Sequence, residues 1–178
     1  MISFRPLVPS DAEMILDWRN SPEVANYMYR NDPISPEEHK IWMSSVLSNP
    51  ESVYCRIIQD DTLPIGLMSL TSINHRQRSC EWGGYLAPDV EKGVGNGKTA
   101  LVESLRIAFE DLRLNRVAVE VLSSNLRALK LYESVGFVRE GILRERTWHG
   151  KEPKDAICLA ILETDWKKSI HVLSSETD

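Results

Sequence analysis

The sequence is poor in cysteine, in net positive charge and in long apolar runs. Its 178 residues include 3 Cys, and 21 Lys and Arg stand against 26 Asp and Glu, which gives a formal net charge of −5. An acidic chain lacks the broad basic field that follows a phosphate backbone, so we expect no nucleic-acid partner. The apolar runs 117–122 and 156–162 have the length of strands. A membrane helix needs roughly 20 such residues, so we expect no membrane span.

The three cysteines, Cys55, Cys80 and Cys158, are widely spaced, and each lies in an apolar segment. This pattern favours reduced thiols in core strands over disulfides or a metal site, so we expect no metal. Residues 1–6 lack the basic and then apolar stretch of a secretory signal, and we therefore expect a cytoplasmic protein. The composition is that of one domain, which we place at residues 1–170, followed by a polar tail at 171–178.

Helix caps and apolar periodicity predict the order of the elements. Ser10 and Ser35 each stand three residues before a glutamate, which is typical of a helix start, and Pro36 strengthens the second signal. Period-two patterns bounded by polar turns indicate strands, and the three strands between residues 53 and 86 form an antiparallel meander. We expect an N-terminal strand, then helices over 11–19, 36–47, a long stretch opened by residues 93–98, and 125–134, and further strands over 53–58, 65–70, 79–86, 116–122, 137–146 and 154–163.

A glycine-rich segment, Lys92-Gly93-Val94-Gly95-Asn96-Gly97-Lys98, joins a strand to the long helix. Such a loop directs unpaired backbone N–H groups outward at the positive end of a helix dipole, which favours a phosphate. The spacing fits neither a Walker A loop nor a dinucleotide fingerprint. Taken alone, these glycines also fit a tight turn with a close helix contact.

This segment resembles the pyrophosphate loop of the GNAT superfamily of N-acetyltransferases, with Lys92 where the family usually has Arg or Gln. A second segment resembles the other signature of that family: Leu122-Ser123-Ser124-Asn125, then Ala128, Leu131, Tyr132 and Val135-Gly136-Phe137. The resemblance covers nearly the whole chain. It implies an α/β fold with a mostly antiparallel, twisted sheet of about seven strands, splayed between the fourth and fifth strands and flanked by about four helices. It also implies an N-acetyltransferase that uses acetyl-CoA.

The same resemblance assigns roles to residues. Tyr132 would protonate the leaving CoA thiolate, although an isolated tyrosine at helical spacing would more often belong to the core. Gly83 and Gly84 would permit close approach at the splayed strand, where a backbone N–H polarises the thioester carbonyl. Contacts with CoA are implied for Leu86, Lys92, Gly93, Val94, Gly95, Asn96, Gly97, Lys98, Asn125 and Lys130.

The N-terminal half carries a second resemblance. The segments Trp18-Arg19-Asn20, Met28, Ile34 to His39 and Thr71-Ser72-Ile73-Asn74 resemble the nucleotide-sugar N-acetyltransferases of pseudaminic acid biosynthesis. Those enzymes acetylate the 4-amino group of a UDP-linked 4-amino-4,6-dideoxy sugar. The resemblance implies that Arg19 and His39 face the diphosphate, and that Tyr85 and Thr71 face the nucleotide or sugar. Arginine suits this role because its donors are planar and bidentate.

Several alternatives stay open at the level of sequence. Arg19 also fits a helix C-terminal charge, and His39 fits a histidine bonded to the backbone. The general base is either Glu81, which shares a strand face with Gly83 and Tyr85, or His39. The acceptor is alternatively a protein N-terminus, as in ribosomal-protein acetyltransferases of the superfamily, or another small amine. A non-catalytic acyl-CoA-binding module would not need Tyr132. The oligomeric state is open, with a homodimer among the options.

Overall fold

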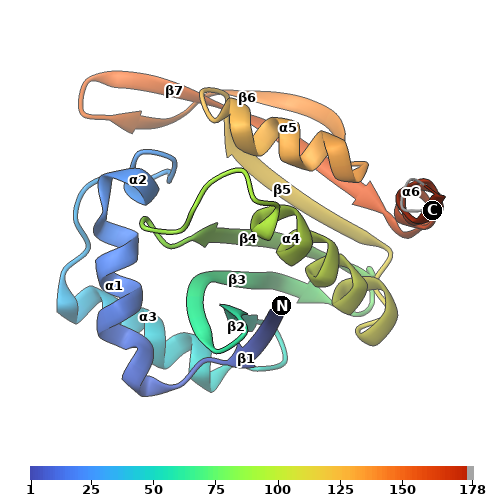
Figure 1. Ribbon diagram of the computed structural model, residues 1–178. Coiled ribbons are helices and arrows are strands. Elements are labelled where there is room, and N and C mark those ends of the chain that lie inside the picture. The colour runs from blue at the N-terminus through green and yellow to red at the C-terminus, as the bar shows by residue number, and fades with distance from the viewer. Residues whose placement is uncertain (176–178) are drawn as a thin grey trace.

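The computed structural model describes residues 1–175, with side chains described through residue 169. A seven-stranded sheet has the order β1-β2-β3-β4-β5-β7-β6 (Figure 1). Every neighbouring pair is antiparallel except β4 and β5, which confirms the expected sheet. The strands are β1 (Ile2–Pro6), β2 (Tyr54–Asp60), β3 (Leu63–Asn74), β4 (Ser79–Leu86), β5 (Arg116–Leu122), β6 (Val138–His149) and β7 (Glu152–Leu162).

Six α-helices, rather than the expected four, accompany the sheet within the described residues. A capping box starts α3, because the Ser35 side chain accepts the Glu38 N–H while the Glu38 carboxylate accepts the Ser35 N–H. The helices are α1 (Ala12–Asn20), α2 (Pro22–Ala25), α3 (Pro36–Ser48), α4 (Asn96–Arg106), α5 (Leu126–Val135) and α6 (Glu163–Ser175), with a 3₁₀ turn η1 (Pro9–Asp11) and a π-helical turn η2 (Ile107–Asp111).

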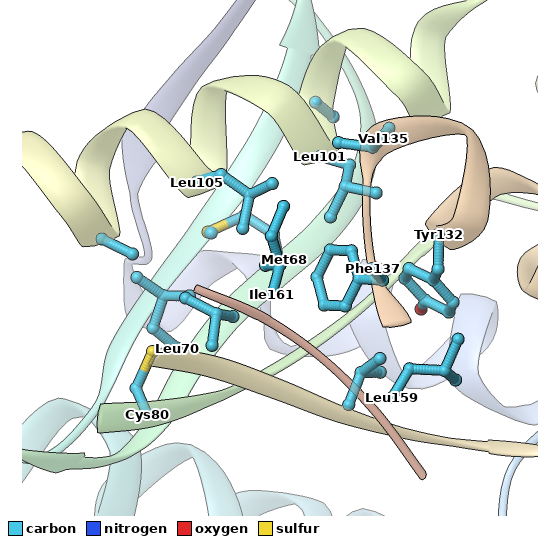
Figure 2. Packing of buried hydrophobic residues seen from close by; sticks show 14 of the residues in the cluster. Met68, Leu70, Cys80, Leu101, Leu105, Tyr132, Val135, Phe137, Leu159 and Ile161 are labelled. Carbon is cyan, nitrogen blue, oxygen red and sulfur yellow. The ribbon is translucent and has the colours of Figure 1, made fainter. Parts of the chain in front are cut away.

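Two hydrophobic layers lie on opposite faces of the sheet. One packs α1 and α3 against β2 and β3, and it includes Ile15, Met43 and Leu67. The other packs α4 and α5 against the opposite face; its members include Met68, Leu70, Leu101, Leu105, Tyr132, Phe137 and Ile161 (Figure 2). Because successive side chains of a strand point to opposite faces, neighbours such as Leu67 and Met68 belong to different layers.

Strands β4 and β5 pair only at one end. Their parallel register runs from Ser79 opposite Arg116 to Glu81 opposite Ala118. Beyond Glu81 the two strands part, while β4 continues to pair with β3 as far as Leu86. Residues 82–86 of β4 therefore present a backbone edge that no β5 residue pairs with. This is the expected splay between the fourth and fifth strands.

The C-terminal segment differs from the expectation. Residues 163–175 form α6, so a polar tail does not begin at residue 171, and residues 176–178 lie outside the described part. The helix is anchored by Trp166, which is 3% exposed and packs against Phe109 with ring centroids 5.3 Å apart. This anchor depends on a residue far away in the sequence, so the local pattern does not reveal it.

The cysteines are free, and Cys55 and Cys80 are buried strand residues, as expected. Burial raises the pKa of the Cys55 thiol to about 11 and that of Cys80 to about 12, so both stay protonated near neutral pH. Cys158 on β7 is partly exposed. Among the described helices, none combines the length and the apolar character that a membrane crossing requires.

Candidate active site

A cavity of about 910 Å³ lies at the gap between β4 and β5. Tyr85 of β4 packs with the α1–α3 layer, whereas Trp82 and Leu86 pack with the α4–α5 layer. All three line the cavity, so it reaches both faces of the sheet through the gap. Two molecules that approach from opposite faces can meet there.

The glycine loop and the start of α4 form one wall of the cavity. Gly93 and Gly95 have φ angles of +94° and +93°, and a Cβ added at either would meet nothing within 4 Å. Glycine is therefore required there for backbone conformation rather than for space. Six of the seven expected loop residues line the cavity, but Val94 is 54% exposed and does not. A loop of this shape before a helix of 11 residues fits a pyrophosphate.

Helix α5 contributes a second wall, in a way that partly departs from the expectation. Asn125 lines the cavity, and its Oδ1 caps α5 by accepting the Ala128 N–H at 3.1 Å. Lys130 is exposed and does not line the cavity. Arg127, almost one turn earlier, lines it instead. The sequence signature predicted the helix, and its cationic side chain in the cavity lining is Arg127.

Tyr132 of α5 lines the cavity on the side of the α4–α5 layer. It is 6% exposed, its ring meets Trp82 edge-on at 5.6 Å, and it packs against Phe137 at 5.3 Å (Figure 2). Burial raises the pKa of the Tyr132 phenol, so the group is protonated near neutral pH.

Trp82, which sequence reasoning missed, also lines the cavity, and its buried Nε1 has no partner among the described residues. A buried donor of this kind is suited to an acceptor atom of a ligand.

Arg19 of α1 and His39 of α3 both line the cavity. Arg19 Nη2 donates to the backbone oxygen of Arg30 at 2.7 Å, whereas its buried Nη1 has no partner within the described chain. His39 is 4% exposed and stacks on Trp42 with ring centroids 5.1 Å apart, and its buried Nε2 likewise meets no described partner. Desolvation lowers the pKa of both groups, so His39 is neutral at neutral pH.

Tyr85, the third expected acceptor residue, lines the cavity on the same side, and burial raises the pKa of its phenol. Thr71 and Glu81 do not line the cavity. They pair with each other where β4 is still bound to β5, and Glu81 is exposed. The expected strand faces are correct, but both residues stand before the gap. Ser69 replaces Thr71 in the lining, two residues back along β3.

Glu120 of β5 is the carboxylate that sequence reasoning missed. Because Glu81 pairs with Ala118 in parallel register, Glu120 lies on the same sheet face as Tyr85, but beyond the point of separation. It lines the cavity, and its Oε2 accepts the Tyr29 hydroxyl at 2.6 Å and Arg146 Nε at 3.1 Å. The available signal was a lone carboxylate between Val119 and Val121 in a strand that is otherwise apolar at that point.

Comparisons with known proteins agree with this geometry. Residues 2–138 match the family model described as an acetyltransferase (GNAT) domain. Acetyltransferase PseH of Campylobacter jejuni subsp. jejuni serotype O:23/36 (strain 81-176) is 32% identical over 135 residues, which covers 76% of this chain and 82% of the relative. Spermidine N(1)-acetyltransferase of Vibrio cholerae serotype O1 (strain ATCC 39315 / El Tor Inaba N16961) is 27% identical over 168 residues, or 93% of this chain and 95% of that one.

Solved structures give the same result. The crystal structure of spermidine N-acetyltransferase from Vibrio cholerae in complex with CoA and spermine has a TM-score of 0.85 at 26% identity, and the match covers 93% of this chain and 98% of that one. The cavity described above has the glycine loop, the strand gap and the buried tyrosine in one place. The chain belongs to the GNAT acetyltransferase family and is an acetyl-CoA-dependent N-acetyltransferase.

Proposed function

We propose that the protein transfers the acetyl group of acetyl-CoA to the 4-amino group of a UDP-linked 4-amino-4,6-dideoxy sugar. The observation that carries this proposal is the buried Arg19 Nη1, which lacks a described partner in the cavity lining. Leaving a buried charged donor unpaired is costly, and a diphosphate supplies an oxygen to it. The 32% identity to acetyltransferase PseH supports the same assignment.

In this mechanism the protein moves two protons. Glu120 accepts one from the attacking sugar amine, which is the role expected above of Glu81 or His39. Tyr132, held protonated by its burial, gives the other to the CoA sulfur as the C–S bond breaks and the C–N bond forms. The unpaired edge of residues 82–86 offers backbone N–H groups to the thioester carbonyl. Gly84 is needed there, since a Cβ would stand 2.9 Å from the Leu67 carbonyl oxygen.

A polyamine is a second candidate acceptor, because Glu23, Glu38 and Glu120 also line the cavity. The similarity to the spermidine acetyltransferases favours it too. However, Glu38 is engaged by Arg30 at 2.8 Å, and Glu120 by Arg146 at 3.1 Å. The buried Arg19 nitrogen without a described partner belongs to a cationic donor, which favours an anionic acceptor. The same cation opposes a basic protein N-terminus.

The test is release of free thiol from acetyl-CoA, with the product mass measured by spectrometry. The acceptor panel contains UDP-linked 4-amino-4,6-dideoxy-N-acetylhexosamines, spermidine, and peptides with basic N-termini. Turnover on the UDP-sugar, with a mass gain of one acetyl group, is the expected result. Turnover only on spermidine or on the peptides contradicts the proposed acceptor, but it leaves the acetyl-CoA side intact.

The proposal includes a cytoplasmic location, where acetyl-CoA and nucleotide sugars are both made, and a homodimer. Sedimentation equilibrium tests the second point, since each chain has a mass of 20.3 kDa. A mass of one chain at micromolar concentration would contradict the homodimer.

A further inference from the structure

The segment between α2 and α3, residues 26–35, forms a strap along the acceptor side of the cavity. Four of its residues, Tyr27, Met28, Arg30 and Ile34, line the cavity. Its C-terminal end is tied to the end of α1, because the Asn20 side chain donates to the Ile34 carbonyl oxygen at 2.9 Å and accepts the Ile34 N–H at 2.8 Å. Arg19 adds its bond to the carbonyl oxygen of Arg30.

The middle of the strap is tied to the other half of the molecule. Thr147 Oγ1 donates to the Tyr29 carbonyl oxygen at 2.6 Å, and His149 Nε2 lies 2.9 Å from the Met28 carbonyl oxygen. Thr147 and His149 belong to β6, whose hairpin with β7 extends past the edge of the sheet toward α2 (Figure 1). The hairpin therefore fixes the strap backbone at Met28 and at Tyr29 itself.

The side chains of Tyr29, Glu120 and Arg146 contact one another. Its hydroxyl donates to Glu120, and the Arg146 guanidinium lies 4.7 Å from the centroid of its ring. Both Tyr29 and Arg146 bond the same oxygen, Oε2 of Glu120, at 2.6 and 3.1 Å. No described residue bonds Oε1, and Glu120 lines the cavity.

We propose that Tyr29 is a positioning residue for the reaction. It holds Oε2 of Glu120, so that Oε1 is presented to the acceptor amine and takes its proton. The docking of the strap on the β6–β7 hairpin sets where the Tyr29 hydroxyl lies. This inference rests on the proposed function of Glu120 as proton acceptor.

The test is a double-mutant cycle on Tyr29→Phe and Glu120→Gln, measured with whichever acceptor turns over in the panel above. Tyr29→Phe removes only the hydroxyl. We expect kcat to fall about tenfold with the KM for acetyl-CoA unchanged, as for loss of one hydrogen bond to a charged group. In the Glu120→Gln background the same change should cause little further loss, because a residue that acts through Glu120 has nothing left to position.

Two further variants sharpen the test. Tyr54→Phe is a matched control, because Arg56 lies 3.8 Å over the ring of Tyr54, and Tyr54 is not part of the cavity lining; its kcat should equal that of the unmodified protein. Thr147→Val removes the donor that docks the strap and leaves the Tyr29 hydroxyl in place. It should lower kcat in the same direction as Tyr29→Phe, with normal acetyl-CoA binding.

The outcomes separate the two proposals. Full kcat in Glu120→Gln overturns the proton-acceptor role and, with it, the proposed mechanism. A strongly impaired Glu120→Gln together with full kcat in Tyr29→Phe overturns the positioning role alone. Losses that multiply in the double mutant show that Tyr29 acts independently of Glu120, which also overturns this inference.

Discussion

Replacing Tyr132 with phenylalanine removes only the phenol oxygen of a side chain that lines the cavity. The ring contacts with Trp82 and Phe137 persist, so we expect the fold and the acetyl-CoA affinity to change little. We expect kcat to fall about 100-fold or more, as for loss of a general acid. Thiol release measures kcat, and calorimetry measures the affinity. An unchanged kcat would exclude Tyr132 as the proton donor.

One guanidinium nitrogen of Arg19 holds the strap, and the other, which is buried, lacks a described partner. We expect Arg19→Ala to raise the KM for the UDP-sugar by about tenfold to 100-fold, as for loss of a charged hydrogen bond, with normal acetyl-CoA binding. Asn20→Ala is the control for the strap, because Asn20 holds the strap at Ile34 but does not itself line the cavity. If both variants raised KM equally, the effect would belong to the strap and not to a phosphate contact.

His39 links stability to pH. Desolvation lowers its pKa in the folded chain below the ordinary value of 6.5, so the unfolded chain takes up the proton first as the pH falls. The stability due to neutral, buried His39 is therefore present above pH 6.5 and is lost below it. Urea unfolding from about pH 7 to 5 should show a smaller loss of unfolding free energy in His39→Gln than in the unmodified protein. Parallel curves for the two proteins would contradict a depressed pKa.

The glycine loop offers a test at the scale of an element. Gly95 precedes α4 with φ +93°, whereas Gly141 on β6 has ordinary backbone and open space around a Cβ. We expect Gly95→Ala to cost about 1 kcal/mol of stability and to weaken acetyl-CoA binding, because the loop amides move. Gly141→Ala should change neither quantity. Equal acetyl-CoA affinity in all three proteins would show that the loop does not hold the pyrophosphate.

The sequence predicted which elements form and on which face of the sheet a side chain lies. It did not predict how far along a strand the cavity begins. The capping box at Ser35 and the glycine loop specify local backbone directly, so α3 begins at Pro36 as expected and α4 begins within the glycine loop. Alternation gave the correct face for Glu81, yet the cavity begins only after the pairing with β5 stops. No local pattern in β4 encodes where that pairing stops.

The other differences between the expected and the observed site residues have the same cause. Glu120 enters the site because β5 runs parallel to β4, and Tyr29 reaches it from 91 residues away along the chain. The helix signature at Asn125 predicted α5, but the rotation of α5 about its axis decides between Arg127 and Lys130. Contacts between distant segments set these choices. The buried Trp166 of α6 is a further case.

At the scale of the whole molecule, ligand binding should raise the melting temperature, because the cavity exists only in the folded chain. Acetyl-CoA at about 100 times its Kd adds about 2.7 kcal/mol, which for a chain of this size corresponds to a Tm rise of about 5–10 °C. We expect the UDP-amino sugar to cause a further rise and spermidine none, as measured by scanning calorimetry. A rise with spermidine alone would favour the polyamine acceptor.

The gap between β4 and β5 also bears on the kinetic mechanism. Because the cavity is reached from both faces of the sheet, neither ligand has to leave before the other enters. Initial-velocity plots against the two substrates should therefore intersect, as for a ternary complex, and should not run parallel, as they do when an enzyme is acetylated between half-reactions. For the same reason CoA and the acetylated product need not depart through a shared exit. Either product can be released first, and dead-end complexes with one substrate and one product should appear as mixed product inhibition.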